Sequence, residues 1–182
     1  VQELAKWNAM PYSSNLLPQY EFIGKGKAPR TLADYKGLRV RAIGGIGDAM
    51  RNIGAVPTSV PATEVYTSLE RGAVDAVSFP STYAHASYKV HEIGSWFTTN
   101  LAPGTQACPT LINKNAWAQL PAQYQKLFEE ARPKVKQALT TAYGKADERN
   151  LPLFKRKLEF ITYPAQELEA FRKMGAQPVW DQ

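Results

Sequence analysis

Arg41 is the residue in this sequence best suited to bind an anion. It ends a short apolar segment that starts at Leu38 and runs into the glycine turn at Gly44 and Gly45. Alternate side chains of a strand share a face, so Arg41 points away from the face that carries Val40. Ligands bind at the carboxyl ends of strands in open α/β sheets, and a guanidinium offers a fork of donors that fits a carboxylate. The segment therefore predicts a carboxylate site at Arg41; a solvated arginine on an edge strand is the alternative.

The elements that must position Arg41 follow the order strand, helix, strand, helix, strand. From apolar spacing and glycine positions we expect strands at 38–43, 56–60 and 73–79 and helices at 47–52 and 63–71. Short connections between such elements are typical of a parallel sheet with right-handed crossovers. Ser78 and Phe79 leave the third strand at the same edge as Arg41, so these residues are expected to face one cleft.

The same signals predict the remaining elements, and the fold class is α/β. We expect the tail of a helix at 1–9 that Pro11 ends, an irregular stretch at 11–30 with a strand at 20–23, a helix at 80–93, extended segments at 95–99 and 110–112, a long helix at 121–158, a strand at 160–163 and a helix at 166–174. Pro133 and Pro152 are expected to kink or interrupt the long helix.

The composition is that of an ordinary globular protein, with 44% hydrophobic and 21% charged residues in a chain of 182. The net charge of +6 suits an anionic ligand or an acidic partner. Nucleic acid is not expected as a partner, because the basic residues are scattered and no nucleic-acid motif is present. No apolar run has the length of a membrane span, and no signal-like segment precedes Val1. We therefore expect a soluble chain from which any export signal has been removed.

The glycine-rich segment at 44–47 suggests an alternative function. Gly44-Gly45-Ile46-Gly47 superficially resembles a phosphate-binding loop, yet it matches neither the dinucleotide-binding pattern nor the Walker pattern. A helix that starts there would still favour an anion near Arg41. A small α/β enzyme that uses this loop for a nucleotide is the alternative.

Other reactive side chains do not combine into a catalytic or metal centre. His85 and His91 lie six residues apart on a predicted helix, so they do not share a face as a metal-binding pair would. Cys108 has no histidine placed in the sequence to activate it, and we interpret it as a small buried hydrophobic residue. Glu64, in the first turn of a helix, and Asp75, within a strand–turn junction, are interpreted as structural. We expect no metal, no cofactor and no catalytic residue.

Four segments, taken together, resemble one protein family. They are KGLRVR at 36–41, GAVP at 54–57, EVYTSLERGAVDA at 64–76 and NKNAW at 113–117. In order and spacing they are similar to the DctP-like substrate-binding proteins of tripartite ATP-independent periplasmic (TRAP) transporters. The resemblance implies a periplasmic protein of two α/β lobes, with the periplasmic-binding-protein-like fold and no enzymatic activity. Such a protein captures an organic acid for the membrane subunits of the transporter.

The chain resembles such a protein without roughly its N-terminal third, so we expect one lobe, crossing segments and a long hinge-spanning helix. The expected parts are a remnant of the first lobe and a crossing segment at 1–36, an α/β second lobe at 37–94, crossing strands and part of the first lobe at 95–120, the lobe-spanning helix at 121–158, and a C-terminal strand and helix at 159–182.

The resemblance also bears on the ligand. Where this chain has Phe79, the family often has an asparagine that hydrogen-bonds the substrate; a phenylalanine can instead cover an apolar or aromatic body. Glu21 lies near a position where several members have another ligand-binding arginine. We expect a monocarboxylate with an apolar or aromatic body; a zwitterion held between Glu21 and Arg41 is the alternative. The predicted ligand-binding residues are Glu21, Arg41, Ala62, Thr63, Ser78, Phe79 and Tyr83.

Overall fold

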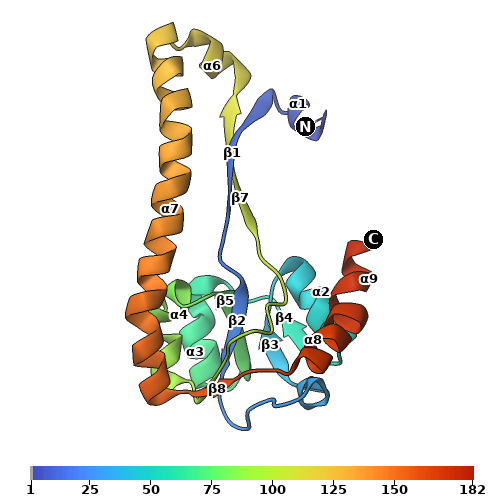
Figure 1. The fold of residues 1–182 in the computed structure, drawn as a ribbon. Coiled ribbons are helices and arrows are strands. Elements are labelled where there is room, and N and C mark those ends of the chain that lie inside the picture. The colour runs from blue at the N-terminus through green and yellow to red at the C-terminus, as the bar shows by residue number, and fades with distance from the viewer. Residues whose placement is uncertain (1) are drawn as a thin grey trace. The chain divides into compact units, whose positions relative to one another are not determined.

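The computed structural model describes residues 2–182, and these fold into two compact units. The ribbon unit comprises the described residues up to Leu17 together with Gln106–Lys145. The sheet unit comprises Pro18–Thr105 and Ala146–Gln182. Figure 1 labels the elements of both units, which are described separately below.

The sheet unit is built on one six-stranded mixed sheet with the strand order β4-β3-β5-β2-β6-β8. Its strands are β2 (Tyr20–Gly24), β3 (Arg39–Arg41), β4 (Val56–Thr58), β5 (Ala76–Pro80), β6 (Trp96–Thr98) and β8 (Glu159–Ile161). The pairs β3–β4 and β3–β5 are parallel, as the predicted βαβ order requires. The sheet is not parallel throughout, however, because β2 inserts antiparallel between β5 and β6.

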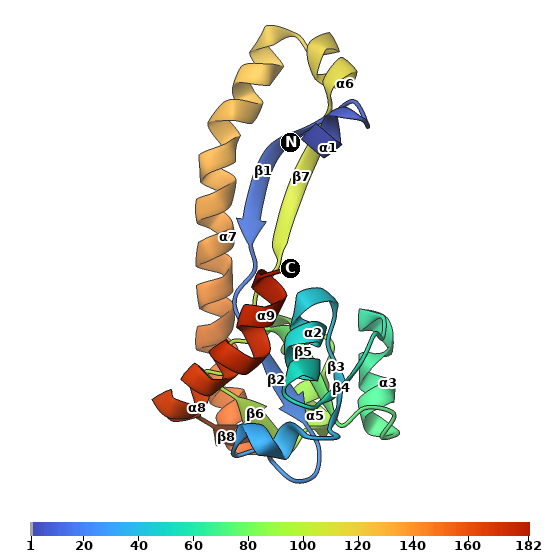
Figure 2. The same ribbon diagram turned by 90° about the vertical axis from the view of Figure 1, so that its right-hand side faces the viewer.

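Helices cover both faces of this sheet. They are η1 (Leu32–Tyr35), α2 (Gly44–Asn52), η2 (Ala62–Glu64), α3 (Val65–Glu70), α4 (Tyr83–Ser87), α5 (Val90–Ile93), the end of α7 (Ala122–Lys157), α8 (Ala165–Phe171), a π-helical turn at Arg172–Ala176 and α9 (Gln177–Trp180). Figures 1 and 2 show α3 and α4 on one side of the sheet and α2 and α8 on the other. This double cover explains why β2, β5 and β6 are buried on both faces.

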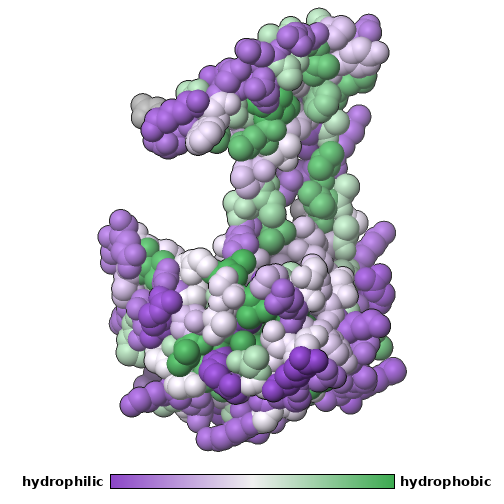
Figure 3. All heavy atoms as spheres, turned by 180° about the vertical axis from the view of Figure 1, so that it is seen from behind, coloured by the Kyte–Doolittle hydropathy of each residue, from purple (hydrophilic) through white to green (hydrophobic). Residues whose placement is uncertain are grey.

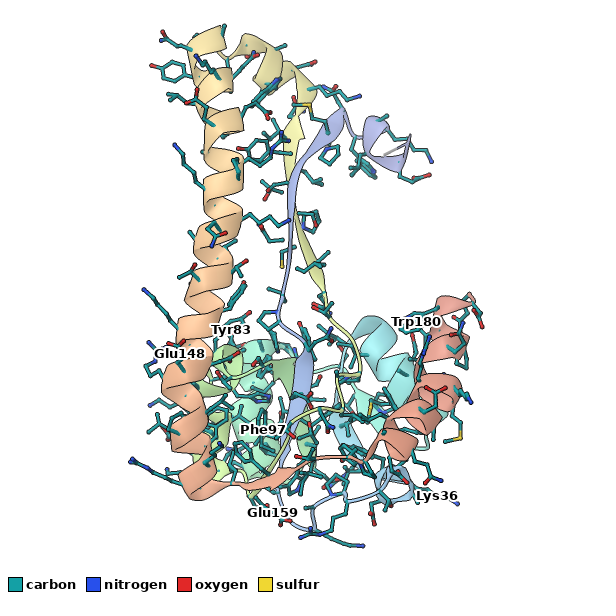
Figure 4. The ribbon with its side chains drawn as sticks, in the orientation of Figure 1. Lys36, Tyr83, Phe97, Glu148, Glu159 and Trp180 are labelled. Atoms are coloured by element: carbon teal, nitrogen blue, oxygen red, sulfur yellow. The ribbon has the colours of Figure 1, made fainter. Side chains whose placement is uncertain are left out.

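The main hydrophobic core lies in the sheet unit, between the sheet and the side of α3, α5 and the end of α7. Its buried members are Ile23, Val65, Leu69, Val74, Val77, Phe79, Ala84, Val90, Phe97, Phe154 and Leu158. Phe97, labelled in Figure 4, packs edge-on against Phe154 and Phe160, with ring centroids 5.5 and 5.3 Å away. Burial of one such side chain contributes roughly 1.5–3 kcal/mol, so this cluster fixes the backbone from which the candidate site projects.

The ribbon unit is a two-stranded antiparallel ribbon with helices. Its elements are α1 (Gln2–Ala5), β1 (Ala9–Leu16), β7 (Ala107–Asn113), α6 (Lys114–Gln119) and the first part of α7. Tyr12, Trp117 and Phe128 form an aromatic cluster with ring centroids 5.7–6.4 Å apart. None of residues 3–17 and 106–145 is buried, and Figure 3 shows apolar side chains at the surface of this unit.

Residues 11–16 were expected to belong to an irregular stretch, and this part of the expectation is wrong, whereas the strand expected at 20–23 is present as β2. Residues 9–16 form β1, which pairs with β7 from Ala9↔Asn113 to Leu16↔Ala107. Pro11 has no backbone N–H to give to a ladder, and the register shifts between Pro11 and Ser13. A proline is tolerated there because the ribbon has only two strands. The interpretation of Cys108 as buried is also wrong, since it lies exposed on β7.

Two helix predictions need correction. The helix expected at 80–93 is two short helices, because Lys89 adopts the left-handed conformation with φ of 57° between α4 and α5. The long helix is one element of 36 residues, and neither Pro133 nor Pro152 ends it.

None of the described helices combines the length and the apolar composition needed to cross a bilayer. The five-part division of the chain expected from the sequence stays a prediction.

Candidate ligand site

Arg41 is buried at the end of β3, with 5% of its surface exposed. Its Nε donates to the carbonyl of Val60 and its Nη1 to the carbonyl of Ser78, both at 3.0 Å. Its Cζ lies 4.8 Å from the centre of the Phe79 ring. Three contacts from two neighbouring segments therefore fix the guanidinium plane.

The charge of Arg41 is not balanced by an acidic side chain. No Asp or Glu among residues 2–182 forms an ion pair with it. Burial lowers the pKa of Arg41, although its ordinary pKa is so high that the guanidinium stays charged. A buried cation is costly without an anion, and neutral carbonyls compensate it only in part. The two hydrogen bonds that Arg41 makes to carbonyls of residues 2–182 use Nε and one hydrogen of Nη1, so neither of them uses Nη2.

Ser78 and Phe79 lie in contact with Arg41, as the predicted common edge requires. The Ser78 hydroxyl is fully buried and donates to the carbonyl of Arg41 at 3.0 Å. The Phe79 ring is stacked with Tyr88, with centroids 5.1 Å apart and an angle of 11° between the rings, and meets His85 edge-on at 5.5 Å. Phe79 itself has 5% of its surface exposed and packs between the Arg41 guanidinium, Tyr88 and His85.

Glu21 is opposite Phe79 in the antiparallel pair of β2 and β5. Its carboxyl group is buried and already accepts two hydrogen bonds, from the Thr98 hydroxyl at 2.5 Å and from the Ala102 N–H at 3.0 Å. Burial raises the pKa of Glu21 to about 7, and the hydrogen bond from Thr98 opposes this shift. This carboxyl group therefore joins β2 to the last residue of β6 and to the segment that follows it.

The other predicted residues lie at the borders of this cluster. Ala62 and Tyr83 are half-buried and pack against the main core. Thr63 is exposed in the 3-10 turn η2, just after the Val60 carbonyl that accepts from Arg41. Tyr83 is the first residue of α4 and is labelled in Figure 4. The structure thus brings Arg41, Ser78 and Phe79 into direct contact.

Three contributors to the cluster were missed from the sequence: the Val60 carbonyl, Tyr88 and His85. His85 is fully buried, and its Nε2 lies 3.0 Å from the carbonyl of Glu21. Burial lowers the pKa of His85 to about 3, so the ring is neutral at neutral pH. A carbonyl carries no sequence signal. Tyr88 is nine positions from Phe79, and the helix break at Lys89 beside it is visible only in the structure.

The glycine segment at 44–47 forms the first turn of α2 rather than a separate loop. A Cβ atom at Gly47 would lie 3.2 Å from the carbonyl oxygen of Ala42 and 3.5 Å from Pro57. Gly47 is therefore explained by the close approach of α2 to its neighbours. Asp75 has a structural role as well, since it accepts from Nε and Nη2 of Arg39 at 2.9 and 2.5 Å.

Comparisons with known proteins agree with this arrangement. The chain is 27% identical over 154 residues to the monocarboxylate 2-oxoacid-binding periplasmic protein of Nostoc sp.. This alignment covers 82% of this chain and 42% of that protein. It superposes on the TRAP periplasmic solute-binding protein of Desulfovibrio salexigens with bound orotic acid at a TM-score of 0.87 and 22% identity, covering 98% of this chain and 57% of that one. The TRAP periplasmic solute-binding protein of Shewanella oneidensis with bound succinate gives a TM-score of 0.83 at 20% identity, covering 97% and 58%.

These structural likenesses confirm the predicted fold class, and the chain spans about half the length of the relatives it matches. The relatives are solute-binding proteins, so the comparisons give no support to an enzyme that uses residues 44–47. Residues 20–182 match the DctP family, described as bacterial extracellular solute-binding protein, family 7, and the chain belongs to this family.

Proposed function

We propose that this chain supplies the carboxylate-binding part of an extracytoplasmic protein that captures an organic acid for a TRAP-type transporter. The observation that carries the proposal is the buried Arg41 guanidinium, which is fixed by two carbonyls and has no acidic partner among the described residues. A ligand carboxylate would supply the missing negative charge. It would meet Nη2 and the second hydrogen of Nη1, since Nε donates to the carbonyl of Val60 and the other Nη1 hydrogen to that of Ser78.

The ligand we propose is a monocarboxylate with an apolar or aromatic body. The Phe79 ring lies against the guanidinium and Tyr88 stacks on that ring, and a phenylalanine cannot donate to a second polar group. The named ligand class of the Nostoc protein and the orotic acid of the Desulfovibrio protein support this choice. The succinate of the Shewanella protein supports a dicarboxylate instead, so the relatives alone do not decide.

The zwitterion alternative loses support from the surroundings of Glu21. Both oxygens of this carboxyl group already accept hydrogen bonds from the protein, one from Thr98 and one from Ala102. Burial raises the pKa of this group to about 7, which makes its ionised form less favourable than that of an ordinary glutamate. It is therefore a poor partner for the amine of a ligand, and we place Glu21 in a supporting role.

The location and the partner follow from the family rather than from the site. Family members are described as extracellular, and the relatives are named periplasmic, which supports a periplasmic location. The name of the transporter class in the solved relatives supports delivery of the acid to TRAP membrane subunits.

A calorimetric titration of the complete protein with orotate, pyruvate and succinate tests the proposal. Arg41→Ala should weaken binding by at least about tenfold, because a hydrogen-bonded charge contributes roughly 1.5–3 kcal/mol. Arg41→Lys should restore affinity only in part, since lysine lacks the fork. The matched control is Arg39→Ala, two residues earlier on β3, where an exposed arginine is paired with Asp75. Equal effects of Arg41→Ala and Arg39→Ala would contradict the proposal.

A further inference from the structure

Asp147 of α7 holds the turn that follows β5. Its Oδ1 accepts from the Ser81 hydroxyl at 2.8 Å, from the Thr82 hydroxyl at 2.6 Å and from the Thr82 N–H at 3.3 Å. Asn150, one helical turn later, adds a bond from its Nδ2 to the Thr82 hydroxyl at 3.3 Å. Thr82 and Asn150 are buried, whereas Ser81 and Asp147 are half-buried, so this network lies at the border of the interior of the sheet unit.

The turn that Asp147 holds has an unfavourable backbone conformation. Ser81 has a φ of +39°. Residues other than glycine, asparagine and aspartate seldom adopt a backbone conformation with a positive φ. The Ser81 N–H also donates to the carbonyl of Gln19 at 2.8 Å. Because Ser81 does not favour this conformation by itself, its partners must maintain it, and Asp147 is the partner of its side chain.

This turn joins the residues that hold Arg41 to the helix that borders the site. Ser78 and Phe79, which contact the guanidinium, come directly before it. Tyr83, the first residue of α4, comes directly after it. A shift of the turn would therefore change the position of the Ser78 carbonyl, the Phe79 ring and the Tyr83 side chain together.

We propose that Asp147 is a positioning residue for the ligand site, which acts through Ser81 and Thr82 without touching the ligand. This inference rests on the proposed function, because it assigns Asp147 to the same carboxylate site. A carboxylate suits the position because one of its oxygens accepts three hydrogen bonds, and an ionised acceptor makes stronger bonds than a neutral one.

The test compares Asp147→Ala, Asp147→Asn and the control Glu148→Ala in the complete protein. Glu148 is the exposed neighbour of Asp147 on α7, labelled in Figure 4. With orotate, pyruvate and succinate as probes, Asp147→Ala should weaken the tightest of the three by about tenfold. Asp147→Asn keeps an acceptor oxygen and should stay within about threefold of wild type, and Glu148→Ala within about twofold.

A double variant separates positioning from general stability. Adding Ser81→Gly to Asp147→Ala should restore most of the affinity, because glycine adopts a positive φ without help from a partner. A role confined to stability predicts a lower melting temperature for Asp147→Ala and an unchanged affinity in the folded protein. An unchanged affinity in folded Asp147→Ala would overturn the inference. A failure of the proposed function has a different sign, because Arg41→Ala would then bind the acids as well as wild type does.

Hydrogen exchange gives a readout that needs no ligand. In Asp147→Ala the amides of residues 81–84 should exchange at least about tenfold faster, with no change at β3. Unchanged exchange there would overturn the inference even if none of the three acids binds. If Asp147→Ala does not fold, Thr82→Val replaces it, since valine has the shape of threonine without the hydroxyl donor. Wild-type exchange and affinity in that variant would count equally against the role of Asp147.

Discussion

Arg41 and Ser78 form a reciprocal pair across β3 and β5: the Arg41 side chain donates to the Ser78 carbonyl at 3.0 Å, and the Ser78 hydroxyl donates to the Arg41 carbonyl at 3.0 Å. Each residue uses its side chain to satisfy the backbone of the other. The pair therefore joins the two parallel strands at the end where ligands bind in α/β sheets. It also explains how a buried arginine keeps one orientation although no acidic side chain of residues 2–182 pairs with it.

Ser78→Ala should lower the free energy of unfolding by about 1 kcal/mol, the usual contribution of one hydrogen bond. The hydroxyl is fully buried, so its loss removes a donor from the Arg41 carbonyl. Urea denaturation at neutral pH measures the change. Ser87→Ala, at an exposed position on α4, is the control and should differ from wild type by less than about 0.5 kcal/mol. No loss of stability in Ser78→Ala would mean that the hydroxyl does not support the strand pair.

The sequence predicts the surroundings of Arg41 well because their signals are local. Alternation of apolar residues, and glycines at the ends of helices, predict β3, α2, β4, α3 and β5 within a few residues of their observed bounds. The placement of Ser78 and Phe79 beside Arg41 follows from this order alone. Local pattern is sufficient here since each element contacts its neighbour in the chain.

The parts that the sequence does not predict depend on distant partners. β1 pairs with β7, about one hundred residues away in the sequence. Pro11 lies within β1, although in the sequence a proline at this place indicates the end of a helix. The carbonyls of Val60 and Ser78 hold Arg41, but a backbone acceptor has no residue type by which to recognise it. In the sequence, Asp147 has no feature that distinguishes it from other polar residues of a helix. Its hydrogen bonds with Ser81 and Thr82 are known only from the structure.

Phe154→Ala should destabilise the protein by about 3–5 kcal/mol, the usual cost of removing a large aromatic side chain from a core. Phe154 is fully buried near the end of α7, edge-on to Phe97 at 5.5 Å and stacked with His91 at 5.1 Å. Leu153→Ala, the exposed neighbour on the same helix, should change stability by less than about 1 kcal/mol. Urea denaturation of both variants makes the comparison, and equal effects would show that the end of α7 is not part of the core.

Glu21 should make the protein less stable as the pH rises from about 4.5 to about 7. Its pKa is about 7 in the folded protein and ordinarily 4.5, so between these values the folded state binds more protons than the unfolded state. The stability that the protonated group contributes is fully present below pH 4.5 and is lost as the pH rises through 7. The shift corresponds to roughly 3 kcal/mol, at about 1.4 kcal/mol per pH unit.

Glu21→Gln isolates this effect, because glutamine keeps the shape of the protonated acid and does not titrate. The difference in unfolding free energy between Glu21→Gln and wild type should grow as the pH rises from 5 to 7.5. The comparison is made as a difference because His85 acts in the opposite direction: its pKa of about 3 means that stability falls as the pH drops below 6.5. A difference that does not change with pH would contradict the raised pKa of Glu21.

Phe79→Asn should shift the preference of the site from monocarboxylates toward dicarboxylates. The ring packs under the Arg41 guanidinium and cannot hydrogen-bond, so a second polar group of a ligand beside it would stay unpaired, at roughly 1–3 kcal/mol. Asparagine removes that penalty and supplies a donor. Competition titrations of the complete protein with benzoate, succinate and alanine measure the preference, and the affinity for succinate relative to benzoate should rise by about tenfold.

Phe79→Leu is the control, since it loses the ring without gaining a donor. It should weaken the binding of every acid and keep their order of affinity. If the wild-type protein already prefers succinate over benzoate, the assignment of Phe79 as the residue that excludes dicarboxylates is wrong; if it prefers alanine, Glu21 has the role of an amine partner after all.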